Sequence, residues 1–294
     1  MVLMSAVAFA LVLSAAVAHA SWNIIAHKVS RIGMPFLWWA ALVATVLWAF
    51  VVPFTGGLGT GELGGFVLGV SVSGVLHVVY MFVLQRGYAR GRLSTVYATA
   101  RGTGPILSTV AAVLLLGERP SPLAIVGVAV IVGGVVSVGL IDRGTSSAGV
   151  AARRGMDPAL FYGLLTGVAI AAYTIWDAHA IRTWEISPVA FMVGCTLVEL
   201  PFYSIALGKR VRELPSVIKN YWPQVLAFGV LSPLSYILVL TAITIAPVSL
   251  VAPMREISVV LVSLFGVFAL RDGRAAWRIG ASVVVVGGIV LLAV

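Results

Sequence analysis

The sequence divides into long apolar runs that are separated by short polar connectors. A window of about 20 residues, the length of helix that crosses a hydrocarbon core of about 30 Å, separates ten such runs. They lie near residues 2–22, 33–54, 63–85, 93–116, 122–141, 158–181, 187–207, 222–243, 247–270 and 276–294. The longest polar connector is residues 142–157, DRGTSSAGVAARRGMD. The pattern predicts an all-α integral membrane protein with ten transmembrane helices.

An internal repeat divides the ten runs into two groups of five. A shift of 154 residues superposes similar residues at both ends of the groups: Trp22 on Trp176, Arg101 on Arg255, Glu118 on Asp272 and Gly133-Gly134 on Gly287-Gly288. Because each copy holds an odd number of spans, the copies cross the membrane in opposite directions, as in many secondary transporters. We therefore predict two five-helix repeats of inverted topology, residues 1–141 and 158–294, joined by the linker 142–157.

The first apolar run also resembles a secretory signal peptide at its end. Ala18-His19-Ala20 has the small-x-small pattern of a cleavage site, but the run lacks a positively charged start. The repeat makes residues 2–22 the counterpart of residues 158–181, which cannot be a signal peptide. We therefore expect a retained first span.

Composition and charge indicate an integral membrane protein. Of 294 residues, 61% are hydrophobic and 10% charged, and the mean hydropathy is +1.09, whereas soluble domains are about 25% charged. The net charge of +9 lies mostly in connectors rather than on a basic face with interleaved aromatics, so nucleic acid is a poor partner. Fifteen of the 19 Lys and Arg residues lie in odd-numbered connectors and two in even-numbered ones. The positive-inside rule predicts cytoplasmic odd-numbered connectors, with both termini outside, in a plasma (inner) membrane.

The sequence carries no motif for catalysis, metal binding or nucleotide binding. A single cysteine, Cys195, excludes an internal disulfide and a cysteine-based metal cluster. Residues 59–64 match GxGxxG, but they join two membrane spans without a preceding buried strand. Walker A, HExxH and nucleophile-elbow motifs are absent from the sequence. We expect a protein that is not an enzyme and that uses no metal or cofactor.

The end of the fourth run carries a resemblance to a known family. The run closes on LLGERPS (residues 115–121) and is followed by GVAVIVGGVV (residues 127–136). Together with ten spans in two halves, these segments resemble the EamA branch of the drug/metabolite transporter superfamily, with residues 1–141 and 158–294 as its two EamA-like repeats. HASWN (residues 19–23) and LSTVYATARGTGP (residues 93–105) are similar to one set of its members.

The resemblance implies a carrier of small metabolites, amino acids, nucleotide sugars or cationic drugs, with a central cavity lined by helices of both halves. Export is implied by the family alone. The family is usually drawn with cytoplasmic termini, whereas the charge distribution predicts the opposite.

Two arginines, Arg101 and Arg255, lie inside predicted spans, each about eight residues from the start of its run. Ionisable residues inside spans are costly and are candidates for function. Because the repeat relates the two at similar depth, we expect them to face each other across the midplane. Such a pair suits a carboxylate or phosphate and resembles the basic residues that hold phosphate in the triose-phosphate branch of the superfamily. Alternatively, Arg101 pairs with Glu199 or Glu256 as a buried ion pair or gate.

Other ionisable groups in the spans are candidates for coupling. Glu256 follows Arg255, but adjacent residues on a helix point about 100° apart, so Glu256 is available for substrate binding, as a proton carrier or as a countercharge. Glu199, Asp177 and His77 are candidates for proton coupling or gating. A fixed countercharge or a packing role is the alternative for each.

Aromatic residues lie near the depth of these charges. Tyr97 precedes Arg101 by one turn and shares its helix face. We predict that Tyr97, Tyr80, Tyr236 and Trp176 contribute to substrate binding, with interface or packing roles as the alternative.

Prolines and small residues predict local features of the helices. Pro105 and Pro253 lie close to the two arginines and predict a kink near the binding level. Gly65, Gly69 and Ser73, at a spacing of four, predict close helix packing.

These features lead to two functional hypotheses. The first is an alternating-access secondary transporter of a small polar metabolite, best matched by an amino acid or another carboxylate- or phosphate-bearing organic anion, acting as a monomer or homodimer. The second is a non-transporting membrane sensor or assembly subunit on the same scaffold, or a carrier of amphipathic or cationic compounds.

Overall fold

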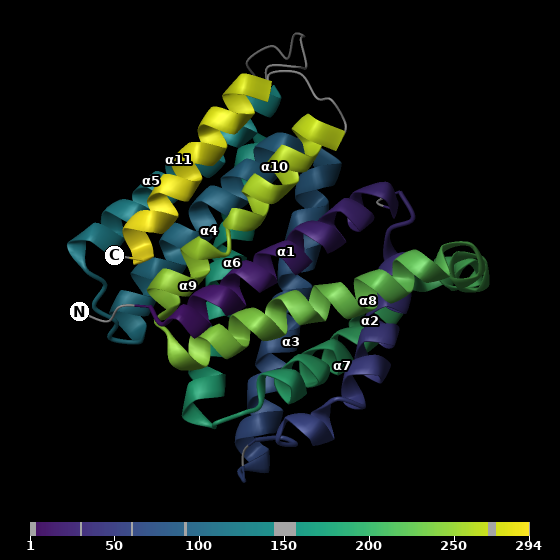
Figure 1. Ribbon diagram of the computed structural model, residues 1–294. Coiled ribbons are helices and arrows are strands. Elements are labelled where there is room, and N and C mark those ends of the chain that lie inside the picture. Colours follow the sequence, from purple (N-terminus) through teal and green to yellow (C-terminus); the bar gives the residue numbers. More distant parts are fainter. Residues whose placement is uncertain are drawn as a thin grey trace. The chain divides into compact units, whose positions relative to one another are not determined.

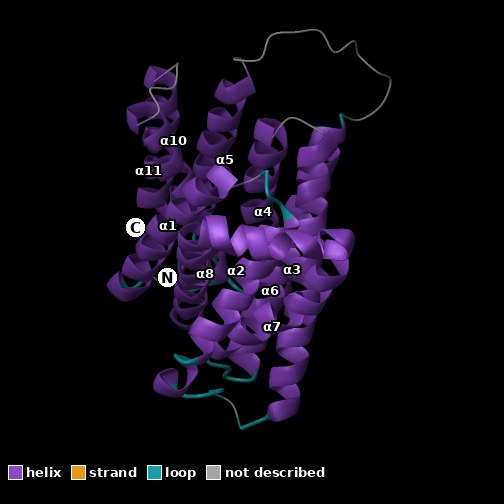
Figure 2. Cartoon of the chain, turned by 90° about the vertical axis from the view of Figure 1, so that its right-hand side faces the viewer, coloured by secondary structure: helices purple, strands orange, loops and turns teal. Residues whose placement is uncertain are grey.

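The computed structural model describes residues 4–29, 31–59, 61–90, 93–143, 157–269 and 275–293. Within these ranges every regular element is a helix (Figure 2), so the predicted all-α class is confirmed there. The helices are α1 (Ala6–Val29), α2 (Met34–Ala49), α3 (Leu63–Arg90), α4 (Leu93–Leu115), α5 (Pro122–Arg143), α6 (Pro158–Thr183), α7 (Pro188–Leu207), α8 (Leu214–Ile245), α9 (Val248–Met254), α10 (Ile257–Ala269) and α11 (Ala275–Ala293), with the 3₁₀ helices η1 (Val52–Thr55) and η2 (Gly208–Glu213). Most of the predicted linker, residues 144–156, lies outside the described residues, as do residues 270–274 of the ninth connector.

Each apolar run of the sequence coincides with one helix, except that the ninth run is divided between α9 and α10. Among the described residues, seven helical stretches are long and apolar enough to cross a membrane. One of them, Pro188–Ile245, joins α7 and α8, and two further apolar helices, Met34–Ala49 and Pro122–Val138, are shorter. The chain is a multi-pass membrane protein, whereas the ten spans and the inverted repeat stay predictions.

The helices pack into two compact units (Figure 1). Unit 1 consists of the described residues of Met1–Ala6, Val79–Ile175 and Ala246–Val294, and unit 2 of those of Val7–Val78 and Trp176–Ile245. Unit 1 therefore holds α4, α5, α9, α10 and α11, and unit 2 holds nearly all of α1 together with α2, α7 and α8. Helices α3 and α6 contribute a segment to each unit. Both units thus combine helices from the two predicted repeats.

In unit 1, α5 and α11 pack side by side through glycines (Figure 1). A Cβ atom built on Gly134 would lie 3.1 Å from the carbonyl oxygen of Ala281, and one built on Gly288 would lie 2.8 Å from that of Gly127. The shift of 154 residues converts the first contact into the second, because Gly134 corresponds to Gly288 and Gly127 to Ala281. Each helix therefore presents the same patch to the other, as across a two-fold axis.

In unit 2, a cluster of buried apolar side chains joins four helices. Val70 of α3, Ile181 of α6, Phe191 of α7 and Leu240 of α8 are members of it. Lipid tails are as apolar as these side chains, so close packing rather than removal from water holds such helices together. The cluster fixes the helices that carry the polar residues of this unit.

The LLGERPS segment ends α4 and prepares the start of α5. Gly117 has a left-handed backbone (φ 68°) that lets the chain turn, and the Glu118 amide donates to the Ala112 carbonyl at 3.2 Å. At the other end, the Ser121 hydroxyl accepts a hydrogen bond from the Ala124 amide at 3.1 Å in the first turn of α5. The segment on which the family resemblance rests is therefore a connector with defined backbone contacts.

Glu118 also holds a third helix. Its two carboxylate oxygens accept hydrogen bonds from the backbone amides of Val248 and Ser249, each at 2.8 Å, in the first turn of α9. These amides have no partner inside their own helix, and a negative charge there is favourable to the helix dipole. Glu118 thus ties the end of α4 to the start of α9 within unit 1.

We expect glycine-to-alanine changes to separate contact from non-contact positions on α5 and α11. Gly134→Ala and Gly288→Ala should each lower the free energy of unfolding in detergent by about 1–3 kcal/mol, because the added methyl group meets backbone of the facing helix. Gly133→Ala and Gly287→Ala are the matched controls, since nothing lies within 4 Å of a Cβ atom at either position. Equal stability of all four variants would contradict the packing.

Loss of the Glu118 charge should weaken the start of α9. Glu118→Gln keeps the size of the side chain but has one acceptor oxygen and no charge, so we expect a loss of about 1 kcal/mol in the free energy of unfolding. Arg119→Gln, at the exposed next residue, is the control and should have little effect. Thermal unfolding in detergent measures both, and a Glu118→Gln protein as stable as Arg119→Gln would refute this capping role.

Candidate functional site

Arg101 is buried in unit 1 and forms an ion pair there. Its Nη1 lies 3.3 Å from Oε1 of Glu256, and the two residues are 7% and 1% exposed. Removing two charges from water costs several kcal/mol for each, and their attraction offsets that cost only when the pair is intact. The structure shows the pairing alternative for Arg101, with Glu256 as its partner.

Tyr97 contacts the same guanidinium group. The Arg101 Cζ lies 5.3 Å from the centroid of the Tyr97 ring, a distance at which a cation is attracted to an aromatic face. Both residues belong to α4, and their spacing of four places them on one face. Arg101 is therefore held between an aromatic ring on its own helix and a carboxylate from another segment.

Glu256 reaches Arg101 from a break in the ninth apolar run. Only Arg255 and Glu256 separate α9 from α10. Pro253 lacks an amide hydrogen, and the Glu256 amide donates to the Pro253 carbonyl at 3.0 Å, a tight contact at a spacing of three. The predicted kink is present near Pro253, whereas α4 continues as one helix through Pro105.

Arg255 and Tyr80 belong to the same unit as the ion pair. Arg255 is 6% exposed, and the charges of Arg101 and Arg255 both act on the Tyr80 hydroxyl. Tyr80 packs edge-on against Tyr173 of α6, with 5.5 Å between ring centroids. A direct approach of the two guanidinium groups stays a prediction. Unit 1 thus contains five of the residues predicted for substrate binding: Arg101, Arg255, Glu256, Tyr97 and Tyr80.

The second oxygen of Glu256 is also buried. Oε2 has no hydrogen-bond partner among the described residues. Buried polar atoms are almost always hydrogen-bonded, so an exception calls for an explanation such as a ligand position. A donor group on a bound molecule would gain a charge-assisted hydrogen bond at this oxygen.

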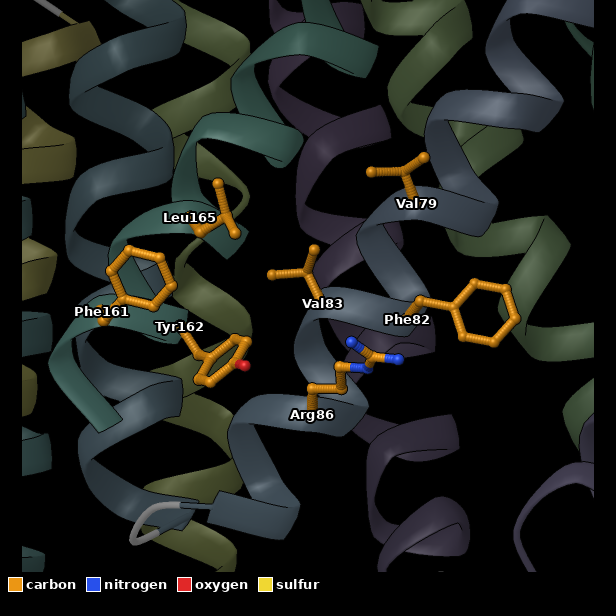
Figure 3. Close-up of a pocket in the computed structure, with 7 residues that line it drawn as sticks. All are labelled: Val79, Phe82, Val83, Arg86, Phe161, Tyr162 and Leu165. Carbon is orange, nitrogen blue, oxygen red and sulfur yellow. The ribbon is translucent and has the colours of Figure 1, made fainter. Parts of the chain in front are cut away.

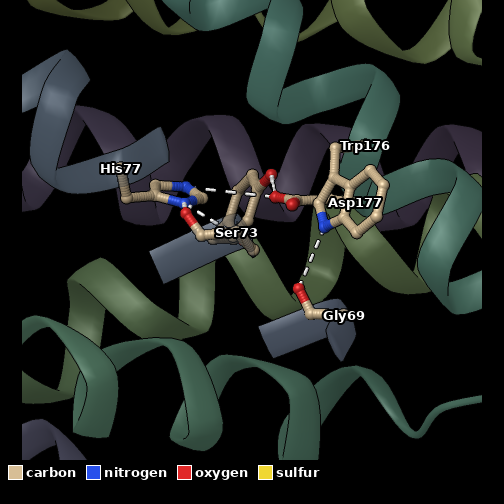
Figure 4. A network of polar contacts seen from close by, with 6 residues as sticks. Gly69, Ser73, His77, Trp176 and Asp177 are labelled. Atoms are coloured by element: carbon tan, nitrogen blue, oxygen red, sulfur yellow. Dashed lines mark hydrogen bonds and ion pairs between the residues drawn. The ribbon is translucent and has the colours of Figure 1, made fainter. Parts of the chain in front are cut away.

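Asp177, His77 and Tyr236 meet in unit 2 (Figure 4). The Tyr236 hydroxyl donates a hydrogen bond to Oδ2 of Asp177, and Nε2 of His77 lies 4.0 Å from the same oxygen. The His77 and Tyr236 rings lie edge-on, with 5.5 Å between centroids. Asp177 is fully buried. The structure therefore brings together three predicted residues from α6, α3 and α8.

Ser73 belongs to this cluster, although the sequence pattern assigned it only to helix packing. Nδ1 of His77 lies 2.9 Å from the carbonyl oxygen of Ser73 and 3.2 Å from its hydroxyl (Figure 4). The two residues are four apart on α3, so they share a helix face. The position of Ser73 four residues before the titratable side chain of His77 was the signal in the sequence that could have identified it.

Trp176 and Glu199, the other predicted residues in unit 2, have different contacts. Trp176 donates its indole N–H to the Gly69 carbonyl at 2.9 Å, which fastens α6 to α3 (Figure 4). Glu199 accepts a hydrogen bond from Tyr203, one turn further along α7, and lies within electrostatic range of His77. Trp176 therefore has a structural contact, and Glu199 adds a second carboxyl group to the surroundings of the histidine.

A groove of about 390 Å³ lies between α3 and α6 in unit 1 (Figure 3). Its walls are mostly apolar, with Val79 and Val83 on α3, Phe161 and Leu165 on α6, and Arg86 as its charged residue. None of the predicted substrate-binding residues lines it. The groove is therefore distinct from the Arg101–Glu256 pair.

Comparisons with known proteins point to a family for the second predicted half. Residues 157–294 match the sequence model of the EamA-like transporter family. The match covers just under half of the chain. No curated protein matches the chain. Among solved structures, one described as "Crystal structure of protein" is 19% identical, with a TM-score of 0.72 over 97% of this chain and 95% of its own. At this identity the likeness shows the fold and leaves activity open.

The ion pair predicts a strong dependence between two substitutions. Arg101→Gln or Glu256→Gln alone should lower the free energy of unfolding by about 3–5 kcal/mol, because each leaves one buried charge without its partner. The double variant should lose much less than the sum of the two. Unfolding of all four proteins in one detergent measures the coupling. Additive losses would show that the contact contributes nothing.

Proposed function

We propose that the protein is a secondary transporter of a small polar metabolite, best matched by an amino acid or another carboxylate-bearing compound, in a plasma membrane. The observation that carries the proposal is the buried Arg101–Glu256 pair at the break between α9 and α10. Discontinuous helices recur at the substrate sites of secondary transporters. The EamA match over residues 157–294 supports a carrier, and the family resemblance favours export.

A zwitterion fits this pair better than a simple anion does. An anion that binds Arg101 would leave Glu256 without its partner in a buried position. An amino acid brings a carboxylate for Arg101 and an ammonium group for Glu256, so both charges stay compensated. The second oxygen of Glu256 offers a further acceptor for that ammonium group.

The inverted repeat provides the proposed transport movement. Rocking of two related halves about a fixed site exposes the site alternately to the two sides of the membrane. The reciprocal contacts of Gly134 and Gly288 support the relation between the halves. With the predicted orientation, the odd-numbered connectors face the cytoplasm.

A non-transporting scaffold is the rival proposal, and the intact ion pair is the observation that favours it. A buried pair can hold helices together without binding a ligand, in which case Arg101 and Glu256 contribute only to packing. A carrier of cationic compounds is a further alternative, supported by the tyrosines close to Glu256. The two rivals predict different results in one transport assay.

Proteoliposomes test the proposal with four labelled probes: an amino-acid mixture, succinate, inorganic phosphate and tetraphenylphosphonium. We expect counterflow of the amino-acid mixture that empty liposomes lack. In the Arg101→Gln/Glu256→Gln double variant, which removes both charges together, we expect this counterflow to fall at least about tenfold, the equivalent of about 1.4 kcal/mol. Arg90→Gln, a change at an exposed arginine that contacts Tyr162, is the matched control.

Each result of this assay selects one proposal. Counterflow of the amino-acid mixture at the wild-type rate by the double variant would show that the pair is structural. Movement of tetraphenylphosphonium alone would favour the cation carrier. A folded protein that moves none of the four probes would favour the non-transporting scaffold.

A further inference from the structure

The polar cluster of unit 2 has the chemistry of a proton site. We infer that His77 and Asp177 bind one proton between them and that its binding and release are coupled to transport. The coupling rests on the proposed transport function. The proton site itself rests only on the contacts of His77, Asp177, Tyr236 and Ser73.

Ser73 determines which ring nitrogen of His77 carries hydrogen in the neutral form. A carbonyl oxygen only accepts hydrogen bonds, and that of Ser73 lies 2.9 Å from Nδ1. We therefore assign the hydrogen to Nδ1, with the Ser73 hydroxyl at 3.2 Å as a second neighbour. The other ring nitrogen, Nε2, accepts a proton when the ring becomes charged, and it lies 4.0 Å from Oδ2 of Asp177. The nitrogen that titrates thus faces a carboxylate.

Tyr236 holds that carboxylate in place. Its hydroxyl donates to Oδ2 of Asp177, and its ring lies edge-on to His77. A proton that arrives from water forms a new N–H bond at Nε2, and the resulting imidazolium is compensated by the Asp177 carboxylate. Release breaks the same bond and restores the neutral ring. One proton enters and one leaves, and no other reactant is needed.

Further ionisable groups lie near His77 on neighbouring helices. On α7, Glu199 lies within electrostatic range of His77 and Asp177 and hydrogen-bonds with Tyr203, and Cys195 lies within range of Asp177 and Ser73. On α1, His19 packs against Trp22 instead. The described residues of α2 include no titratable side chain. Among the described residues, the charged groups named around His77 are therefore carboxylates.

The two residues of the proton site differ in burial. The His77 side chain is 16% exposed, whereas that of Asp177 is fully buried. Shielding of the carboxylate strengthens its attraction to a nearby cation. Imidazole is also the side chain that changes charge between about pH 5 and 8, the range in which cellular proton gradients lie.

The proton site is tested without any substrate by solid-state NMR of protein with ¹⁵N-labelled histidine in liposomes. We expect His77, identified by the loss of its signals in His77→Gln, to carry hydrogen on Nδ1 alone at about pH 9 and on both nitrogens at about pH 5. Asp177→Asn should move the midpoint of this titration to lower pH by about one unit or more, because the compensating charge is lost.

Two controls accompany the NMR measurement. Ser73→Ala keeps the backbone carbonyl and should leave the hydrogen on Nδ1. His179→Gln removes an exposed histidine on α6 and should leave the His77 signals unchanged. A neutral His77 with its hydrogen on Nε2, or a titration that Asp177→Asn does not alter, would overturn the proton site.

Coupling is tested in the same liposomes with the labelled amino-acid mixture. We expect an imposed pH gradient to raise initial uptake severalfold, and the response to be lost in His77→Gln and Asp177→Asn but kept in His179→Gln. Transport that ignores the gradient in the wild-type protein would overturn the coupling and leave the proposed function standing. Absence of transport would overturn the proposed function and the coupling together, while NMR alone would decide the proton site.

Discussion

The absence of water inside a bilayer is the constraint on which the rest of this structure depends. A guanidinium group on α4 is tolerable only if the protein supplies its countercharge, and Glu256 does so at 3.3 Å. Glu256 lies where the ninth apolar run is broken, between α9 and α10. The break begins two residues after Pro253 and holds Glu256, whose carboxylate pairs with Arg101 of α4. The same constraint applies to backbone amides, which need hydrogen-bond acceptors inside the protein. Glu118 accepts the hydrogen bonds of the first amides of α9.

Much of the fold could be predicted from the sequence, because the hydropathy of each segment indicates whether it can form a helix in contact with lipid. The ten apolar runs coincide with described helices, apart from the division of the ninth, and the shift of 154 residues relates the two glycines that approach backbone across α5 and α11. Spacing on one helix also placed Tyr97 against Arg101. The compact units could not be predicted in this way. They depend on which helices pack together, and a repeat in the sequence does not determine that.

The sequence indicated the ionisable residues of the candidate site, but it did not indicate which of them form pairs. Glu199 and Glu256 were equivalent as partners of Arg101, because distance along the chain does not tell which segment reaches α4. The structure selects Glu256 and places Glu199 in unit 2, beside Tyr203. The contacts of Glu118 and Ser73 were missed for a related reason. Each contact involves backbone groups, the amides of Val248 and Ser249 for Glu118 and the carbonyl of Ser73 itself for His77, and backbone groups are the same whatever the side chain.

The Arg101–Glu256 pair and the cluster of His77 and Asp177 differ in the kind of binding event that can change their contacts. Arginine keeps its charge at any physiological pH, so a ligand that separates the Arg101–Glu256 pair must replace both charges to keep them compensated. The contact of His77 with Asp177 changes when a single proton binds or leaves. Helices α3 and α6 each carry residues of both kinds of cluster: His77 and Tyr80 lie three apart on α3, and Tyr173 and Asp177 lie four apart on α6. Tyr80 also lies within electrostatic range of Arg101 and Arg255. The permanent charge of Arg101 lies on α4 and its partner lies at the break between α9 and α10, whereas His77 and Asp177 lie on α3 and α6, so a zwitterion and a proton would act on different helices.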